Sequence, residues 1–371
     1  QNIEDYHKQH LIAGSEFSND QISFFEKNRK FIGFLIPFCF MHLCWWTLAI
    51  RYDIFGLYST HYELPITMVL GATVAGMTSE GGGAVAFPVM TLLLKIPPTI
   101  ARDFSLMIQS CGMTSATFTI LWMKIKLEWN SIIFCTIGAT VGIVLGLEFV
   151  DQLISAATKK MLFVAIWFSF ALSLWLLNTQ KKRTTHESIQ NMCLWKRIVL
   201  ILVGFIGGLC SAFAGSGVDV CSFSILTLLF RVSEKTATPT SVVLMAANTC
   251  VGFFWRQLIM VEIDELAWNY FKCSGKFFPV VVICAPFGSL LGSHFHRLVL
   301  ASFVYVLEIV ALVGFLLTGP PLHLVIIGSG IVIFGFWFFY GISKAGQMLE
   351  EQNHRPLPEV ICDSMKTPIL P

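Results

Sequence analysis

Charged residues are scarce in this chain of 371 residues. Asp, Glu, Lys and Arg make up 13% of it, whereas about a quarter of an average soluble domain is charged. Hydrophobic residues make up 55%, and the mean hydropathy is +0.70. Because so few charges cannot cover the surface of a soluble protein, we expect lipid to cover it. The formal net charge of +2 also gives no reason to expect nucleic acid as a partner.

The sequence also lacks the patterns of enzymes and metal-binding proteins. It has 11 cysteines but no Cys-x-x-Cys pair, and most of them lie inside apolar runs, where a cysteine behaves as a small buried hydrophobe. His294 and His296 form an isolated pair. No nucleophile–base pair, cofactor fingerprint or metal-ligand set is recognisable. We therefore expect no catalytic activity, no cofactor and no metal site.

Apolar runs of membrane-spanning length recur along the chain, with short polar connections between them. This pattern predicts a single all-α integral membrane unit that crosses the bilayer many times. The predicted spans are 31–50, 99–123, 131–150, 161–178, 237–257, 277–294, 299–318 and 322–342, together with two broken segments at about 66–94 and 198–230.

The two broken segments are copies of one pattern. In each, an apolar run is cut by a Gly-rich stretch, resumes, ends in Thr-Leu-Leu and reaches an Ala-x-x-x-Ser turn. A constant offset (227 − 91 = 136) aligns the pairs Gly71–Gly207, Gly81–Gly217, Thr91–Thr227 and Ser105–Ser241. Interrupted hydrophobic segments at matching places in two halves are typical of the binding site of secondary transporters.

Each broken segment could either cross the membrane or enter and leave on one side as a re-entrant hairpin. Lys and Arg favour the cytosolic side. With hairpins and the N-terminus inside, 17 of the 25 basic residues lie inside and 8 lie outside or in the membrane; with crossing segments the split is 11 to 14. The charge distribution therefore favours hairpins. The eight are Arg51, Lys95, Arg102, Lys159, Lys160, Arg256, Lys272 and Lys276.

Each repeat then holds one Gly-broken re-entrant hairpin and three transmembrane helices, which is an odd number of crossings, so the second repeat is inverted relative to the first. Gly142-x-x-x-Gly146 and Gly288-x-x-x-Gly292 are interpreted as helix-packing motifs. The predicted organisation is a polar segment at 1–30, an extra helix at 31–50, repeat one at 66–178, a basic cytosolic loop at 179–197, repeat two at 198–319, an extra helix at 322–343 and a polar tail at 344–371.

A break inside the membrane frees backbone N–H groups and begins a new helix whose N-terminus favours an anion. Two such breaks meeting at the midplane predict a cradle for a small anion. The alternative is that the glycines only allow close packing, and that each Ser or Thr hydroxyl bonds back to its own helix. The candidate substrate-binding residues are Thr78, Ser79, Gly81, Gly82, Gly83, Ser105, Gln109, Ser216, Gly217, Ser241 and Asn248.

Four ionisable residues near the breaks are candidates for coupling or charge recognition, because ionisable groups inside a membrane are costly and usually functional. Glu80 is either a proton-coupling acid or a cap for the freed N–H groups. Arg102 pairs with Asp103 or Glu80, holds the substrate, or lies at the membrane interface. Asp219 follows the second break directly, at the position aligned with Gly83.

Both copies contain further fixed positions around the glycines. The motifs are Gly76-x-x-x-x-Gly81-Gly82-Gly83, Pro88 and Ile96-Pro97-Pro98-x-x-Ala101, then Gly207-Gly208-x-x-Ser211-x-x-x-Gly215-x-Gly217 and Ala237-Thr238-x-Thr240-Ser241. These paired motifs resemble the sulfite exporter TauE/SafE-like family of membrane permeases over about residues 69–319. In the second copy Val218 and Asp219 stand where the family usually has Gly-Gly, and Ser224 stands in place of Pro. The resemblance implies export or uptake of small sulfur-containing anions, such as sulfite or organosulfonates.

The sequence thus predicts a multi-pass membrane transporter of a small oxyanion bound at the midplane. A passive channel and a non-transporting membrane subunit of a larger assembly are the alternatives. The expected partners are the anion and the lipid bilayer, with a homo-oligomer or larger membrane complex left open.

A labelling experiment checks the predicted topology. A single cysteine introduced into the loop at 181–197 should resist a membrane-impermeant thiol reagent added to intact cells, whereas one placed at Lys95 should react. The background protein would have its native cysteines replaced. Ready labelling within 181–197 from outside would refute the orientation.

Overall fold

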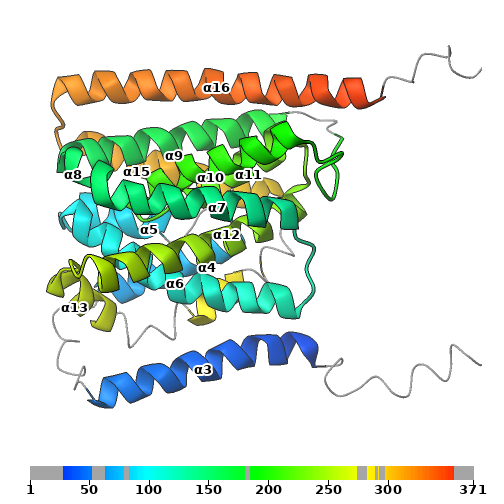
Figure 1. The fold of residues 1–371 in the computed structure, drawn as a ribbon. Helices are drawn as coiled ribbons and strands as arrows, with labels where there is room; N and C mark the ends of the chain where they lie inside the picture. Colours follow the sequence, from blue (N-terminus) through cyan, green and yellow to red (C-terminus); the bar gives the residue numbers. More distant parts are fainter. Residues whose placement is uncertain are drawn as a thin grey trace, which may run out of the picture.

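The computed structural model describes residues 28–51, 63–78, 83–179, 184–273, 282–288, 291 and 297–354. Within these residues the regular structure is helical, apart from one isolated bridge between His186 and Val232. The long helices lie roughly parallel or antiparallel in a bundle, with α3 along one outer side and α16 along the opposite side (Figure 1). The predicted all-α architecture is confirmed for this part of the chain.

Several helices are continued by short π-helical stretches, which are labelled η. The α-helices are α3 (Arg29–Arg51), α4 (Glu63–Met77), α5 (Gly83–Pro88), α6 (Pro98–Trp122), α7 (Trp129–Leu145), α8 (Asp151–Leu153), α9 (Ala156–Thr179), α10 (Leu194–Ala214), α11 (Val218–Ser224), α12 (Glu234–Phe254), α13 (Glu265–Cys273), α15 (Arg297–Leu317) and α16 (Leu322–His354). The π-helical stretches are η2 (Val89–Leu93), η3 (Gly146–Val150), η4 (Ile225–Leu229) and η5 (Trp255–Ile259).

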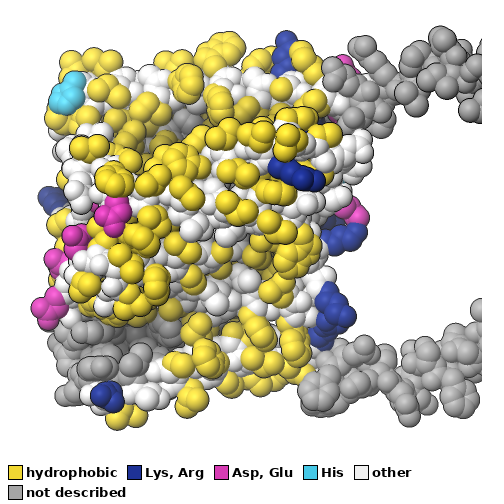
Figure 2. Space-filling model, in the orientation of Figure 1, with side chains coloured by type: hydrophobic (Ala, Val, Ile, Leu, Met, Phe, Trp, Pro, Cys, Tyr) yellow, Lys and Arg dark blue, Asp and Glu magenta, His cyan; other side chains and the backbone are white. Residues whose placement is uncertain are grey.

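Among the described residues, six helical stretches are long and apolar enough to cross a membrane: Pro98–Trp122, Trp129–Leu153, Ala156–Leu176, Leu194–Ala214, Glu234–Ile259 and Leu322–Glu351. Their outward faces are apolar. On α16, Phe334 and Trp337 are 71% and 62% exposed, and hydrophobic side chains cover most of the face in Figure 2. Soluble proteins rarely expose so large an apolar surface to water, so we conclude that lipid covers these faces. The chain is an integral, multi-pass membrane protein.

The predicted spans coincide with helices wherever the chain is described, and three boundaries differ by four residues or more. Helix α9 begins at Ala156, five residues before the predicted start at 161. Helix α10 begins at Leu194, inside the predicted basic loop, and α16 runs on to His354 through the predicted polar tail. The residues from Lys344 to His354 include no proline and are mostly good helix formers, so nothing stops α16 earlier. The predicted span at 277–294 lies largely outside the described residues, although 282–288 are helical.

Basic residues gather at one end of the bundle. The start of α3, the turn between α6 and α7, the start of α10 and the end of α16 lie together there (Figure 1). Lys124, Lys126, Arg197 and Lys344 are all exposed in these segments. Figure 2 shows Lys and Arg side chains at this end and most of the visible Asp and Glu side chains at the other. By the positive-inside rule, we expect the basic end to face the cytosol.

Helices α7 and α10 cross with their backbones almost in contact. A Cβ atom on Gly138 would lie 2.0 Å from the carbonyl oxygen of Ile201, and one on Gly142 would lie 2.2 Å from that of Phe205. From the other side, a Cβ on Gly204 would lie 2.1 Å from the Cys135 carbonyl oxygen. The packing role predicted for Gly142 is therefore confirmed. Small residues allow such close approach of membrane helices.

Replacing Gly142 should separate these two helices. Gly142→Leu forces a side chain against a backbone carbonyl that cannot rotate away, and overpacking of this kind costs about 1–3 kcal/mol or more. We expect a lower melting temperature in detergent, followed by size-exclusion chromatography of heated samples. Gly330→Leu on α16 is the matched control, because nothing lies within 4 Å of its added Cβ. Equal melting temperatures for the two variants would contradict the packing role.

Candidate functional site

The two broken segments share local structure at the same offset of 136 residues. The π-helical stretches η2 (Val89–Leu93) and η4 (Ile225–Leu229) occupy equivalent positions. Thr91 and Thr227 each donate a hydrogen bond of 2.7 Å to the carbonyl four residues earlier. Each segment then ends on a left-handed residue, Lys95 at φ 56° and Arg231 at φ 55°. The duplication read from the sequence therefore extends to the backbone conformation.

The first break falls between α4 and α5. The predicted residues Ser79, Glu80, Gly81 and Gly82 lie outside the described residues. Of the two flanking candidates, Thr78 donates its hydroxyl to the Val74 carbonyl at 2.8 Å. Gly83 begins α5. Gly83 is therefore the described residue that marks the far end of the first break.

The second break lies between Ala214, the last residue of α10, and Val218, the first of α11. Gly215 has a left-handed conformation, with φ at +77°. It also touches α6 closely, because a Cβ on Gly215 would lie 2.6 Å from the Ser105 Cβ and 2.9 Å from the Arg102 carbonyl oxygen. Both its conformation and its surroundings therefore require glycine.

The two breaks meet beside α6. A Cβ on Gly83 would lie 2.6 Å from Gln109 Nε2 and 3.1 Å from the Ser216 Cβ. Gln109 Nε2 donates to the carbonyl of Gly215 at 2.8 Å and to that of Ser105 at 3.1 Å. Gln109 thus connects the second break to α6 at the point where Gly83 of the first segment arrives. The structure brings together four of the predicted residues, Gly83, Ser105, Gln109 and Ser216, with Gly215 of the second motif.

Three buried polar atoms here and on the neighbouring α12 have no hydrogen-bond partner among the described residues. They are the Oγ of Ser105, the Oε1 of Gln109 and the Oδ1 of Asn248. The three residues are 0%, 1% and 2% exposed. Buried polar groups are normally hydrogen-bonded, so these atoms have unused capacity for water or a ligand. All three belong to the predicted set of substrate-binding residues.

Several other hydroxyls are engaged by their own helices. Ser241, the counterpart of Ser105, donates to the Thr238 carbonyl at 2.8 Å. Ser110, Ser211 and Thr240 likewise donate to carbonyls three or four residues earlier. Ser105 and Ser241 therefore differ, although they occupy equivalent positions.

Asp219 and Ser216 form a compact hydrogen-bonded group at the second break. The backbone N–H of Gly217 donates to Asp219 Oδ1 at 2.9 Å. The hydroxyl of Ser216 lies 3.3 Å and 3.1 Å from the two oxygens of the same carboxylate. Asp219 is 2% exposed. A carboxylate of the chain itself thus accepts the freed N–H of Gly217. Met245 of α12, which the sequence did not indicate, lies 3.8 Å from the Ser216 hydroxyl.

Arg102 belongs to a buried ionic network. It is 1% exposed and therefore buried inside the protein. Its guanidinium contacts Asp103 at 2.8 Å and Asp151 at 2.5 Å. Asp151 also pairs with Lys159 at 2.6 Å, and Asp103 pairs with Arg256 at 3.0 Å. The network joins the start of α6 to α8, α9 and η5, at the end of the bundle opposite to the basic end.

The predicted pair of Arg102 and Asp103 is present, and its further partners were missed. Asp151, Lys159 and Arg256 are distant in sequence and carry no motif that would assign them to this network. The guanidinium of Arg102 also lies 3.3 Å from the Ala212 carbonyl, in the last turn of α10 before the second break. The network thus holds the backbone next to the site.

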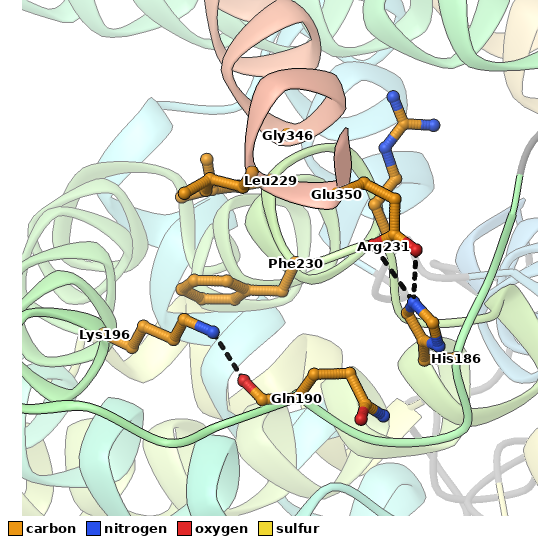
Figure 3. Close-up of a pocket in the computed structure, with 9 residues that line it drawn as sticks. His186, Gln190, Lys196, Leu229, Phe230, Arg231, Gly346 and Glu350 are labelled. Carbon is orange, nitrogen blue, oxygen red and sulfur yellow. Dashed lines mark hydrogen bonds and ion pairs between the residues drawn. The ribbon is translucent and has the colours of Figure 1, made fainter. Parts of the chain in front are cut away.

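A separate recess lies at the basic end of the bundle. Glu350 of α16 points toward His186, with Nε2 2.9 Å from Oε1, and Lys196 Nζ donates to the Gln190 carbonyl at 2.5 Å (Figure 3). Burial lowers the pKa of Arg231, and the Glu350 carboxylate opposes this effect. The contact between Glu350 and His186 therefore holds α16 against the segment that precedes α10. It contains none of the predicted site residues.

Asp103→Asn should destabilise the fold strongly. It removes the charge that Arg102 and Arg256 share, and breaking a buried ion pair from one side costs about 3–5 kcal/mol. Glu262→Gln is the control, because Glu262 pairs with the same Arg256 at 2.7 Å but is 55% exposed, where a pair contributes about 0–1 kcal/mol. Thermal unfolding in detergent measures both. A smaller loss for Asp103→Asn than for Glu262→Gln would contradict the assigned role.

Comparison with known proteins identifies the family of the chain. The family described as sulfite exporter TauE/SafE matches residues 64–318. This range is more than half of the chain, and it includes both broken segments, α6 and the ionic network. None of the curated proteins and none of the solved structures matches the chain. The chain belongs to the sulfite exporter TauE/SafE family, whose members are membrane transporters of sulfur-containing anions.

Proposed function

We propose that this protein transports a small oxyanion, such as sulfite or an organosulfonate, bound where the two broken segments meet beside α6. The observation that carries the proposal is the group of unpartnered buried atoms on Ser105, Gln109 and Asn248. Leaving a polar atom buried without a partner costs about 1–3 kcal/mol. A ligand that forms hydrogen bonds with these three atoms would remove that cost.

The types of these atoms suit a small polar ligand. The hydroxyl of Ser105 can donate to an oxyanion or accept from it, and the two amide oxygens accept only. A singly protonated oxyanion offers both acceptor oxygens and an O–H donor to these atoms. A sulfonate has no O–H group, and in its case a bridging water donates to the amide oxygens. Gly83 lies against the side chains of Gln109 and Ser216, and Gly215 lies against that of Ser105, so the backbone at both breaks is next to the candidate binding side chains.

We further propose that each broken segment is a re-entrant hairpin and that the two repeats are inverted. The second segment supports this, because it starts and ends at the same end of the bundle. The rings of Trp195, near the start of α10, and Phe230, after η4, have centroids 6.1 Å apart. The backbone N–H of His186 donates to the Arg231 carbonyl at 2.9 Å. Inversion would place the two breaks at one depth, as alternating access around a fixed site requires.

Reconstitution in liposomes tests the transport proposal. Liposomes that contain the purified protein should take up radiolabelled sulfite faster than protein-free liposomes. Ser105→Ala should raise the KM for sulfite by about 10-fold or more, because hydrogen bonds to charged groups contribute about 1.5–3 kcal/mol. Ser241→Ala is the matched control at the equivalent position, and its effect should be smaller because its hydroxyl already bonds to Thr238.

Two results would count against this proposal. Folded wild-type protein that moves neither sulfite nor an organosulfonate would refute transport and favour a non-transporting membrane subunit. Equal effects of Ser105→Ala and Ser241→Ala would leave transport standing and refute the assignment of Ser105 to the site.

A further inference from the structure

We infer that Asp219 is a specificity-determining residue: its carboxylate is a built-in anion at the second break, and it restricts the site to monovalent oxyanions. The inference rests on the proposed function and narrows its substrate class. Repeat one has Gly83 at the position equivalent to Asp219, so a carboxylate at this position is present in the second repeat only.

The carboxylate takes the contacts that an oxyanion would take at this break. Both of its oxygens lie within hydrogen-bond distance of the Ser216 hydroxyl, at 3.3 Å and 3.1 Å, and Oδ1 also accepts the N–H of Gly217 at 2.9 Å. An ionised carboxylate is an acceptor only, and this arrangement of donors suits it. With those donors occupied, a substrate cannot use them unless Asp219 moves.

The carboxylate is also close to the proposed substrate position. Ser216, which bonds to it, has its Cβ 3.1 Å from the place where a Gly83 Cβ would be. Gln109, which carries one of the unpartnered atoms, donates to the carbonyl of Gly215, the residue before Ser216. One hydrogen bond therefore separates the fixed charge from the residues at which the breaks meet.

Charge at this distance discriminates between anions. A fixed negative charge repels a dianion twice as strongly as a monoanion in the same position. When the ligand lies within about 10 Å of the carboxylate, at an effective dielectric constant of about 20, one additional negative charge on the ligand lowers its affinity by roughly 10-fold or more. Water is excluded from buried sites, so salt screens this repulsion only weakly.

Methanesulfonate and sulfate are the probes, because they are tetrahedral, similar in size and differ by one charge. Each is tested as an inhibitor of radiolabelled sulfite uptake into proteoliposomes. Wild-type protein should be inhibited at least 10-fold more strongly by methanesulfonate than by sulfate. Asp219→Asn should bring this ratio close to one, mainly through stronger inhibition by sulfate, whereas Asp219→Glu should keep it.

Two further variants secure the result. Asp219→Gly copies the residue at the equivalent position of repeat one, and it replaces Asp219→Asn if the latter does not fold. Glu265→Gln removes a carboxylate from an exposed position at the start of α13, and it should leave the ratio unchanged.

The outcomes are distinct. A wild-type preference for sulfate, or an unchanged ratio in folded Asp219→Asn or Asp219→Gly protein, overturns the role of Asp219 while transport stands. A wild-type protein without sulfite uptake overturns the proposed function, and the inference falls with it. A ratio that collapses only when the charge at residue 219 is lost supports the inference.

Discussion

A helix interrupted inside a bilayer exposes backbone N–H and C=O groups that lipid cannot satisfy, so an interruption persists only where protein or water supplies partners. Much of this structure depends on that constraint. At the second break, Gln109 donates to the Gly215 carbonyl and Asp219 accepts the Gly217 N–H. Asp219 belongs to α11, which follows the break, whereas Gln109 belongs to the separate helix α6. Helix α6 therefore has to lie against the break.

The buried ionic network stabilises the arrangement that this constraint requires. Arg102 lies one turn of α6 before Ser105, and its partners Asp103 and Asp151 hold it below the membrane-facing surface. Buried charges are stable only when each is well paired, so the network fixes α6 against α8, α9 and η5. Close packing between α7 and α10 positions the last turn of α10, and with it the start of the break.

The sequence allowed much of this fold to be predicted, because hydrophobic length and internal duplication are local properties. The same offset of 136 residues relates backbone features that only the structure revealed, such as the left-handed residues Lys95 and Arg231. The ionic partners could not be predicted in the same way. Asp103 and Arg256 lie 153 residues apart, and only the folded arrangement of α6 and η5 brings them together.

The candidate site shows the same division between what is local and what is not. The glycines at 83 and 215 were recognised from the pattern, since few other residues fit a break. The behaviour of the hydroxyls was not recognisable, because Ser105 and Ser241 are equivalent in sequence and differ in whether the side chain finds a carbonyl of its own helix. That choice depends on side-chain rotamers and neighbours, which the spacing of residues does not encode.

Duplication supplies two similar breaks, but the two halves of the site have diverged in chemistry. On the side of repeat one, α6 contributes Ser105 and Gln109, each with a buried atom still able to bind. On the side of repeat two, Asn248 also has such an atom, but the break holds its own carboxylate and the hydroxyl of Ser241 is engaged. A symmetric pair of anion-binding breaks would place two sets of donors around one substrate. Here one set is occupied by Asp219, so a substrate would be recognised mainly by repeat one while repeat two sets the charge that it tolerates.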